Sequence, residues 1–186
     1  MAAVELFPER KLRIRHSLGS GFYAEFEGGI VPTPEELALL KERMKAIVER
    51  NLPITRRKRL SEEVAAEYAQ HGFDDRLDLL ETRPHLYRTV NYLGNMPGYF
   101  YGALAPSSGY VPHFDIAPYY NGFYVALPER LNPEQVTTDI HLDKMFDIFH
   151  EYQQWIDIMG VSTVGDLNRR VMEGDASELI KIAEAF

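Results

Sequence analysis

The amino-acid sequence predicts an α+β fold: an antiparallel sheet with packed helices over residues 1–128, followed by a helical segment over residues 129–186. Three observations predict it. Residues 11–18 alternate between the two faces of a half-buried strand, and residues 110–126 have the pattern of a strand hairpin around Asn121-Gly122. Residues 33–50 carry apolar side chains at helical spacing, and from about residue 140 helical spacing is the only pattern.

The first predicted elements form a hairpin. In "KLRIRHSL" (11–18), Leu12, Ile14 and His16 share one face of a strand. "GSG" (19–21) turns the chain, and "FYAEF" (22–26) returns it as a second strand. On the apolar face, His16 is expected to be a hydrogen-bonded residue at the edge of the core.

A helix is predicted to begin at "TPEE" (33–36). Thr33 can cap it, Pro34 suits its first position, and Glu36 completes a capping box. The helix carries one apolar stripe and is expected to stop at Pro53. The residues of the stripe are Leu37, Leu40, Met44, Ile47 and Val48.

A strand or extended edge is predicted for "PITRRKRL" (53–60), and a helix for the residues that begin at Ser61. Gly72 is expected to end that helix, and a short helix is predicted over 74–81.

Residues 86–128 are predicted to be all strand. "LYRTVNYL" (86–93) is rich in β-branched and aromatic residues, and "GNMPG" (94–98) is expected to break the run. A strand carrying His113 is expected after the Pro106–Gly109 turn. Asn121-Gly122 is the dipeptide that a type I′ hairpin turn favours, because both residues take positive φ.

Three helices are predicted after residue 140. Aromatic and apolar residues from Phe146 to Met159 stripe the first, which Gly160 closes. Thr163 and Asp166 begin the second, and Gly174 closes it. "SELIKIAEAF" (177–186) begins the third and stops without a terminating residue, as expected of a chain cut inside a helix.

Composition narrows the class of protein. The chain has 186 residues and a net charge of −8, which argues against broad nucleic-acid binding but leaves room for a local basic patch. It contains no cysteine, which excludes disulfides and thiolate chemistry. No apolar run approaches the ~18 residues of a membrane span. We expect a cytoplasmic protein that does not enter a membrane.

Few residues have a pattern typical of catalysis. No G-x-x-x-x-G-K-[ST] motif occurs. His113 and Asp115 are predicted to share one strand face, which suits either acid–base chemistry or a surface hydrogen bond. We predict no metal site, because a third ligand is not apparent.

Basic and aromatic residues offer a second kind of site. Arg13 and Arg15 are predicted to share the polar face of their strand, either as a solvated row or as an anion site. Tyr101 belongs to a set of aromatics able to stack on bases or to pack within the sheet. "RRKR" (56–59) divides its charges between two strand faces, so we expect a solvated edge there.

The order of segments in residues 4 to about 125 resembles the editing domain of threonyl-tRNA synthetases, which is also called the second additional domain. The matching segments are "ELFPERK", "SLGSGFYAEF", "PEELALLKERM" and the strand and helix that follow them. In that family a Cys-x-x-x-His segment joins an upstream His-x-x-x-His pair to form the editing pocket. Alignment on Pro106–Gly109 places Phe100 at the cysteine and Leu104 at the histidine, and the upstream pair falls at about Met1 and before it. The resemblance therefore implies that the editing reaction is absent.

Several segments, from "SLGSGFYAE" (17–25) through the helix of Trp155 to the last predicted helix, are similar to the central region of bacterial uridine kinase-like proteins, in which a ubiquitin-like TGS domain precedes this domain and a P-loop kinase follows it. The matching segments include "ALAPSSGYVPHFDIAPYYNGFYVALP" and "GVSTVGDLNRRVMEGDASELIKIAEA". This likeness implies a non-catalytic accessory segment that docks neighbouring domains or binds a ligand. It places ATP and Mg²⁺ in the kinase domain and no cofactor in this segment.

Two alternatives stay open. One is an editing-type hydrolase of mischarged tRNA that uses His113 and Asp115. The other is a module that binds RNA or a nucleotide through Arg13, Arg15 and Tyr101.

Overall fold

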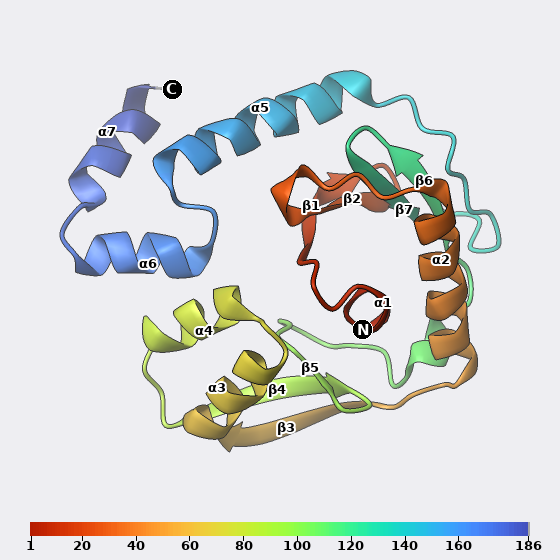
Figure 1. Cartoon of the computed structure of the whole chain (residues 1–186), viewed down its shortest axis with the longest axis horizontal. Coiled ribbons are helices and arrows are strands. Elements are labelled where there is room, and N and C mark those ends of the chain that lie inside the picture. The colour runs from red at the N-terminus through yellow and green to blue at the C-terminus, as the bar shows by residue number, and fades with distance from the viewer. Residues whose placement is uncertain (186) are drawn as a thin grey trace. The chain divides into compact units, whose positions relative to one another are not determined.

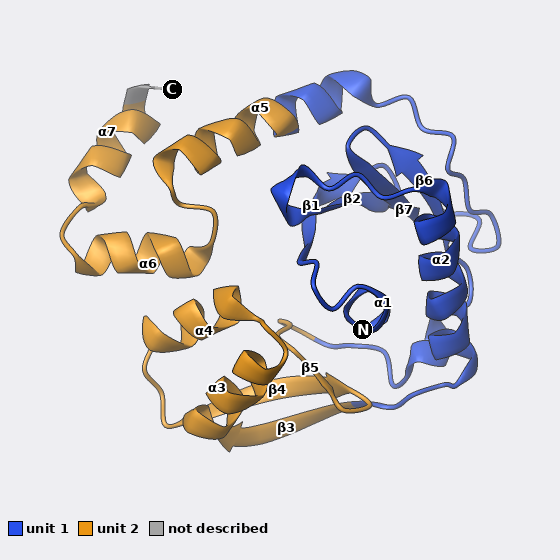
Figure 2. Cartoon of the chain, viewed as in Figure 1, with its two compact units in different colours: residues 1–54, 103–149 blue, residues 55–102, 150–186 orange. Residues whose placement is uncertain are grey.

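The computed structural model describes residues 1–185. Its helices and strands confirm the predicted α+β class (Figure 1). The described chain divides into two compact units (Figure 2). Unit 1 comprises Met1–Ile54 and Ala103–Phe149, and unit 2 comprises Thr55–Gly102 and the residues from His150 onward. The predicted division of the chain into residues 1–128 and 129–186 stays a prediction.

Unit 1 is built on an antiparallel sheet with the strand order β1-β2-β7-β6. Its core contains the fully buried Leu18, Tyr124 and Ala126. The buried rings of Phe26 and Phe123 lie 6.1 Å apart on neighbouring strands. The strands are β1 (Leu12–Leu18), β2 (Gly21–Phe26), β6 (Asp115–Tyr119) and β7 (Gly122–Ala126).

Helix α2 (Pro34–Glu49) begins as predicted. The Thr33 hydroxyl accepts a hydrogen bond from the Glu36 amide, and the Glu36 carboxylate accepts one from the Thr33 amide. Leu37, Leu40 and Ile47 are buried, so the predicted apolar stripe faces the core. Unit 1 also contains α1 (Ala2–Leu6), η1 (Glu27–Gly29) and η2 (Ser108–Tyr110).

Unit 2 contains a sheet with the strand order β3-β4-β5. The strands are β3 (Ile54–Leu60), β4 (Tyr87–Leu93) and β5 (Met96–Gly98), of which β4 and β5 are antiparallel. Helices α3 (Ser61–Gln70) and α4 (Asp74–Glu81) follow β3. Val64 and Tyr68 of α3 pack on Val90 and Tyr92 of β4, which places α3 on one face of this sheet.

Over residues 1–185 the last three helices match the prediction, and Phe186, the last residue of the predicted third helix, lies outside the described residues. Helix α5 (Asp143–Met159) starts in unit 1 and continues into unit 2, where α6 (Val164–Met172) and α7 (Ala176–Ala185) follow. The α6 capping box between Thr163 and Asp166 is present. Gly160 and Gly174 have φ of 65° and 86°, which suits glycine after a helix. Within residues 1–185, no helix combines the length and apolar character that a membrane span requires.

The first hairpin departs from strict alternation. The β1–β2 register shifts between Ile14 and His16, and Ile14 is 64% exposed. This bulge breaks the predicted apolar face, because an extra residue changes which way the following side chains point. His16 nevertheless lies among aromatics, with its ring stacked 4.3 Å from that of Phe149.

Three predicted local features, a strand, a strand break and a helix start, were wrong in detail. Residues 99–114 contain no strand, so His113 precedes β6. "GNMPG" does not simply break a strand: Leu93 pairs with Met96 around a tight β4–β5 hairpin. Ser61 is the first residue of α3 but does not cap it, because its hydroxyl donates to the His85 carbonyl.

The β6–β7 hairpin exists, but its turn lies one residue earlier than predicted. Tyr119 pairs with Gly122, so the turn residues are Tyr120 and Asn121, and Tyr120 has φ of 46°. Gly122 is required for a different reason: a Cβ there would lie 2.2 Å from the Ala24 carbonyl oxygen of β2.

Candidate functional site

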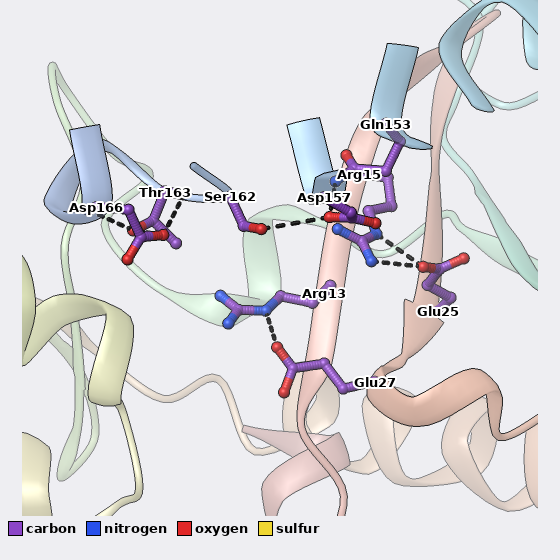
Figure 3. Close-up of polar contacts among 9 residues, drawn as sticks. All are labelled: Arg13, Arg15, Glu25, Glu27, Gln153, Asp157, Ser162, Thr163 and Asp166. Carbon is purple, nitrogen blue, oxygen red and sulfur yellow. Dashed lines mark hydrogen bonds and ion pairs between the residues drawn. The ribbon is translucent and has the colours of Figure 1, made fainter. Parts of the chain in front are cut away.

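The predicted basic row on β1 is neutralised by carboxylates of unit 1. Arg15 Nε donates to Glu25 Oε1 at 2.8 Å, and Arg15 Nη2 lies 2.7 Å from the same oxygen. Arg13 Nε donates to Glu27 (Figure 3). An anion would have to displace these partners, so the two arginines form ion pairs along the sheet rather than an open anion site.

Tyr23 extends the same network. Its hydroxyl donates to Glu25 Oε2 at 2.9 Å. Burial raises the pKa of Tyr23 well above its ordinary value, and the hydrogen bond to the Glu25 carboxylate and its negative charge raise it further. Glu25 is therefore shared by an arginine and a neutral phenol, which is the geometry of a structural link between β1 and β2.

The structure does not pair His113 with Asp115. Asp115 lies at the start of β6, and its carboxylate is 2.6 Å from Lys41 Nζ of α2. It also accepts a hydrogen bond from the Ile116 amide at 2.6 Å. His113 is exposed in the loop before β6. The predicted common strand face was therefore wrong, because the strand begins after His113.

The charge state of Asp115 follows from its partners. Partial burial alone raises the pKa of a carboxyl group, but the Lys41 ammonium and the Ile116 amide outweigh it and lower the pKa of Asp115. A carboxylate held ionised by a lysine is a weak proton acceptor at neutral pH. This geometry suits an attachment of β6 to α2 better than general base catalysis.

The two positions aligned with the editing residues lie near the surface. Phe100 is 60% exposed in unit 2, and a Cβ on Gly98 would meet its ring at 2.7 Å, so the ring lies on the backbone of β5. Leu104 belongs to unit 1 and is 39% exposed. Neither hydrocarbon side chain can bind a metal or activate water.

Tyr101 adds a polar group to the Phe100 segment of unit 2. It is 79% exposed, and its hydroxyl lies 2.8 Å from that of Tyr99. Phe100 and Tyr101 belong to unit 2, whereas Arg13, Arg15 and Leu104 belong to unit 1, as do His113 and Asp115. The seven predicted positions therefore do not form one site within a single unit.

The Pro106–Gly109 turn is a structural clamp that sequence reasoning missed. Ser108 is buried, and its Oγ donates to the Ile47 carbonyl at 2.7 Å and accepts from the Leu52 amide at 2.8 Å. Ser107 Oγ donates to Asn51 Oδ1. The two hydroxyls thus fasten this turn to the end of α2, where helix carbonyls lack intrahelical partners. The only signal in the sequence was the pair of serines.

A hollow of about 270 Å³ lies between α5, α6 and α7 of unit 2. Trp155, Ile158 and Leu179 provide part of its apolar lining. Arg170 also lines it, but that guanidinium donates to Asp175 and to the Met159 carbonyl, so it holds the three helices together. Among the described residues, no group of three or more histidines or carboxylates is placed to hold a metal ion.

Comparison with known proteins gives a partial relationship. No protein-family model matches the chain. The threonine–tRNA ligase of Syntrophomonas wolfei is 36% identical over 83 residues, which are 45% of this chain and 13% of the ligase. Threonine–tRNA ligase 1 of Bacillus subtilis is 31% identical over 116 residues, or 62% of this chain and 18% of the ligase. The ligase of Rickettsia akari is 31% identical over 120 residues, with the same coverage.

The chain thus spans less than a fifth of the length of these curated relatives. Up to 62% of it is similar to a segment of threonine–tRNA ligases, which supports a domain like the synthetase editing domain. The same similarity does not support a uridine kinase parent.

Proposed function

We propose that this chain is a non-catalytic accessory domain, related to the threonyl-tRNA synthetase editing domain, of a multidomain uridine kinase-like protein. Its role is to dock the neighbouring TGS-like and kinase domains or to bind a ligand for them. The observation that carries the proposal is the hydrocarbon at Phe100 and Leu104, where editing domains of the family place a cysteine and a histidine.

Two features of the structure support the non-catalytic role. The Asp115 carboxylate is occupied by Lys41, and Arg13 and Arg15 are occupied by glutamates. A substitute hydrolytic centre needs a base within reach of a water molecule and a group that orients the base. His113 is exposed and lacks the predicted carboxylate partner within unit 1, so the hydrolase alternative has little support.

A deacylation assay tests the loss of catalysis. The substrate is a threonine-specific tRNA that has been mischarged with serine. It is incubated separately with the chain, with the His113→Ala variant and, as the positive control, with an editing-active threonine–tRNA ligase. We expect the chain to release serine no faster than buffer does. Release that falls in the His113→Ala variant would establish the hydrolase instead.

The kinase parent is tested separately. The full reading frame of the gene should encode a G-x-x-x-x-G-K-[ST] motif after this segment. The purified full-length protein should then transfer phosphate from ATP to uridine in the presence of Mg²⁺, both bound by the kinase domain. If the reading frame lacks that motif, the proposal of a kinase parent is wrong. The conclusion on catalysis from the deacylation assay does not depend on this result.

A further inference from the structure

In unit 2, basic residues are concentrated in the β3-β4-β5 sheet and acidic residues in the helices that cover one of its faces. Within these three strands five residues are basic (Arg56, Arg57, Lys58, Arg59, Arg88) and none is acidic. Helices α3 and α4 carry seven acidic residues and one arginine. Figure 2 shows both helices on the same side of the sheet. In a chain of net charge −8, basic side chains on the face away from both helices are therefore not covered by these carboxylates.

Two of the basic side chains on the helix-covered face, Arg57 and Arg59, contact groups on that face. Arg59 of β3 lies 2.8 Å from Glu63 and 3.1 Å from Glu67 of α3. Arg57 lies over the ring of Tyr92, whose hydroxyl donates to Glu67. Since side chains alternate along a strand, Arg56 and Lys58 point to the opposite face.

We call this opposite side the open face and define it by Arg56, Lys58, Tyr87, Thr89 and Phe100. Tyr87 and Thr89 alternate with Val90 and Tyr92 on β4, so they point away from α3. Tyr87 is 50% exposed, and Lys58 Nζ lies 4.9 Å from the centre of its ring. Arg56, Lys58 and Thr89 are exposed as well.

Phe100 follows β5, the edge strand opposite β3, and its ring lies on the open face. Gly98 of β5 pairs with Asn91 of β4, and the Phe100 ring lies where a Gly98 side chain would be. Asn91 is buried, and its Nδ2 donates to the Phe100 carbonyl at 3.4 Å, which anchors the segment. One side of the Phe100 ring therefore packs on the β5 backbone, and the other side is exposed to solvent.

We propose that the open face binds single-stranded nucleic acid. Two exposed rings on a sheet offer stacking surfaces for unpaired bases, and the adjacent cations offer contacts to phosphates. An acidic peptide would use the cations but would gain little from the rings. The proposal is independent of the accessory role and moves the predicted RNA contact away from Arg13 and Arg15.

Fluorescence anisotropy with a labelled single-stranded oligouridylate tests the proposal. Binding at low salt should weaken as salt rises, and Tyr87→Ala should lower the affinity at least about fivefold without changing the salt dependence. The double variant Arg56→Ala with Lys58→Ala should lower the slope of log K against log salt by about 1.4, which corresponds to two phosphate contacts. Phe100→Ala should repeat the Tyr87 result.

The matched control is the double variant Lys45→Ala with Lys144→Ala, which removes the same charge from unit 1 and should bind as the wild type does. Circular dichroism spectra check that each variant is folded, and Tyr87→Ala serves alone if Phe100→Ala unfolds. Three results would each overturn the proposal: no binding at low salt, equal losses in the control, or equally effective competition by polyglutamate or polyphosphate.

Discussion

The Ser108→Ala substitution removes the centre of the clamp that joins the Pro106–Gly109 turn to α2. The hydroxyl serves one acceptor, the Ile47 carbonyl, and one donor, the Leu52 amide. Neighbouring groups do not replace it, because the Asn51 amide donates to the Val48 carbonyl instead of that of Ile47. The variant would therefore leave two backbone groups without partners.

The size of the effect follows from burial. Ser108 is 7% exposed, so water does not readily take the place of its hydroxyl. Leaving one buried polar group unsatisfied costs about 1–3 kcal/mol, and we expect a total loss of about 2–4 kcal/mol for the pair. The loss is expected to be local to unit 1, because every partner of the clamp belongs to that unit.

Urea unfolding followed by circular dichroism measures the loss, and hydrogen–deuterium exchange shows where it occurs. The Leu52 amide should exchange faster in the variant, while amides of α3 should keep their protection. Ser20→Ala makes the same chemical change at an exposed turn and serves as the control. If Ser108→Ala is no more destabilising than Ser20→Ala and the Leu52 amide stays protected, the clamp does not contribute as argued.

Three further substitutions test the rest of unit 1. Thr33→Ala should lower the free energy of unfolding by about 0.5–2 kcal/mol, because the α2 capping box loses its acceptor; urea titration measures it. Lys41→Met should raise the pKa of Asp115 toward its ordinary value, as read from carboxyl-carbon NMR. Because the folded-state pKa of Asp115 is lowered, the pair stabilises the wild type above the ordinary pKa, and that contribution is lost as pH falls through the folded value. The variant should show a smaller acid-dependent loss, since only the Ile116 hydrogen bond to the carboxylate remains. Gly122→Ala should cost about 1–3 kcal/mol, since its methyl group would press on the Ala24 carbonyl; an unchanged urea midpoint would contradict the close approach of β2 and β7.

The predicted elements agreed best with the structure where the determining contacts are local. Both capping boxes lie within four residues of sequence, so Thr33 with Glu36 and Thr163 with Asp166 could be recognised without knowing the fold. The apolar stripe of α2 was predicted for the same reason, because helical spacing alone decides which residues share a face.

The errors concern features that depend on neighbours distant in sequence. Asn121-Gly122 looked like a turn, but the close approach of β2 accounts for the glycine, and the turn moved to Tyr120. His113 and Asp115 looked like a pair, but the strand starts at Asp115, and Lys41 of α2 is its partner. The position of α2 beside β6 was not visible in either segment alone.

The sequence by itself determined the α+β class, most helix and strand positions and the hydrocarbon at Phe100 and Leu104, because these depend on residue type and short-range spacing. Only the tertiary structure decided which charges are neutralised. It placed Glu25 and Glu27 beside the arginines of β1, and it left Arg56 and Lys58 beside exposed rings. The physical reason is that electrostatic interactions depend on distance in space, and strand pairing brings together charges that the sequence keeps apart.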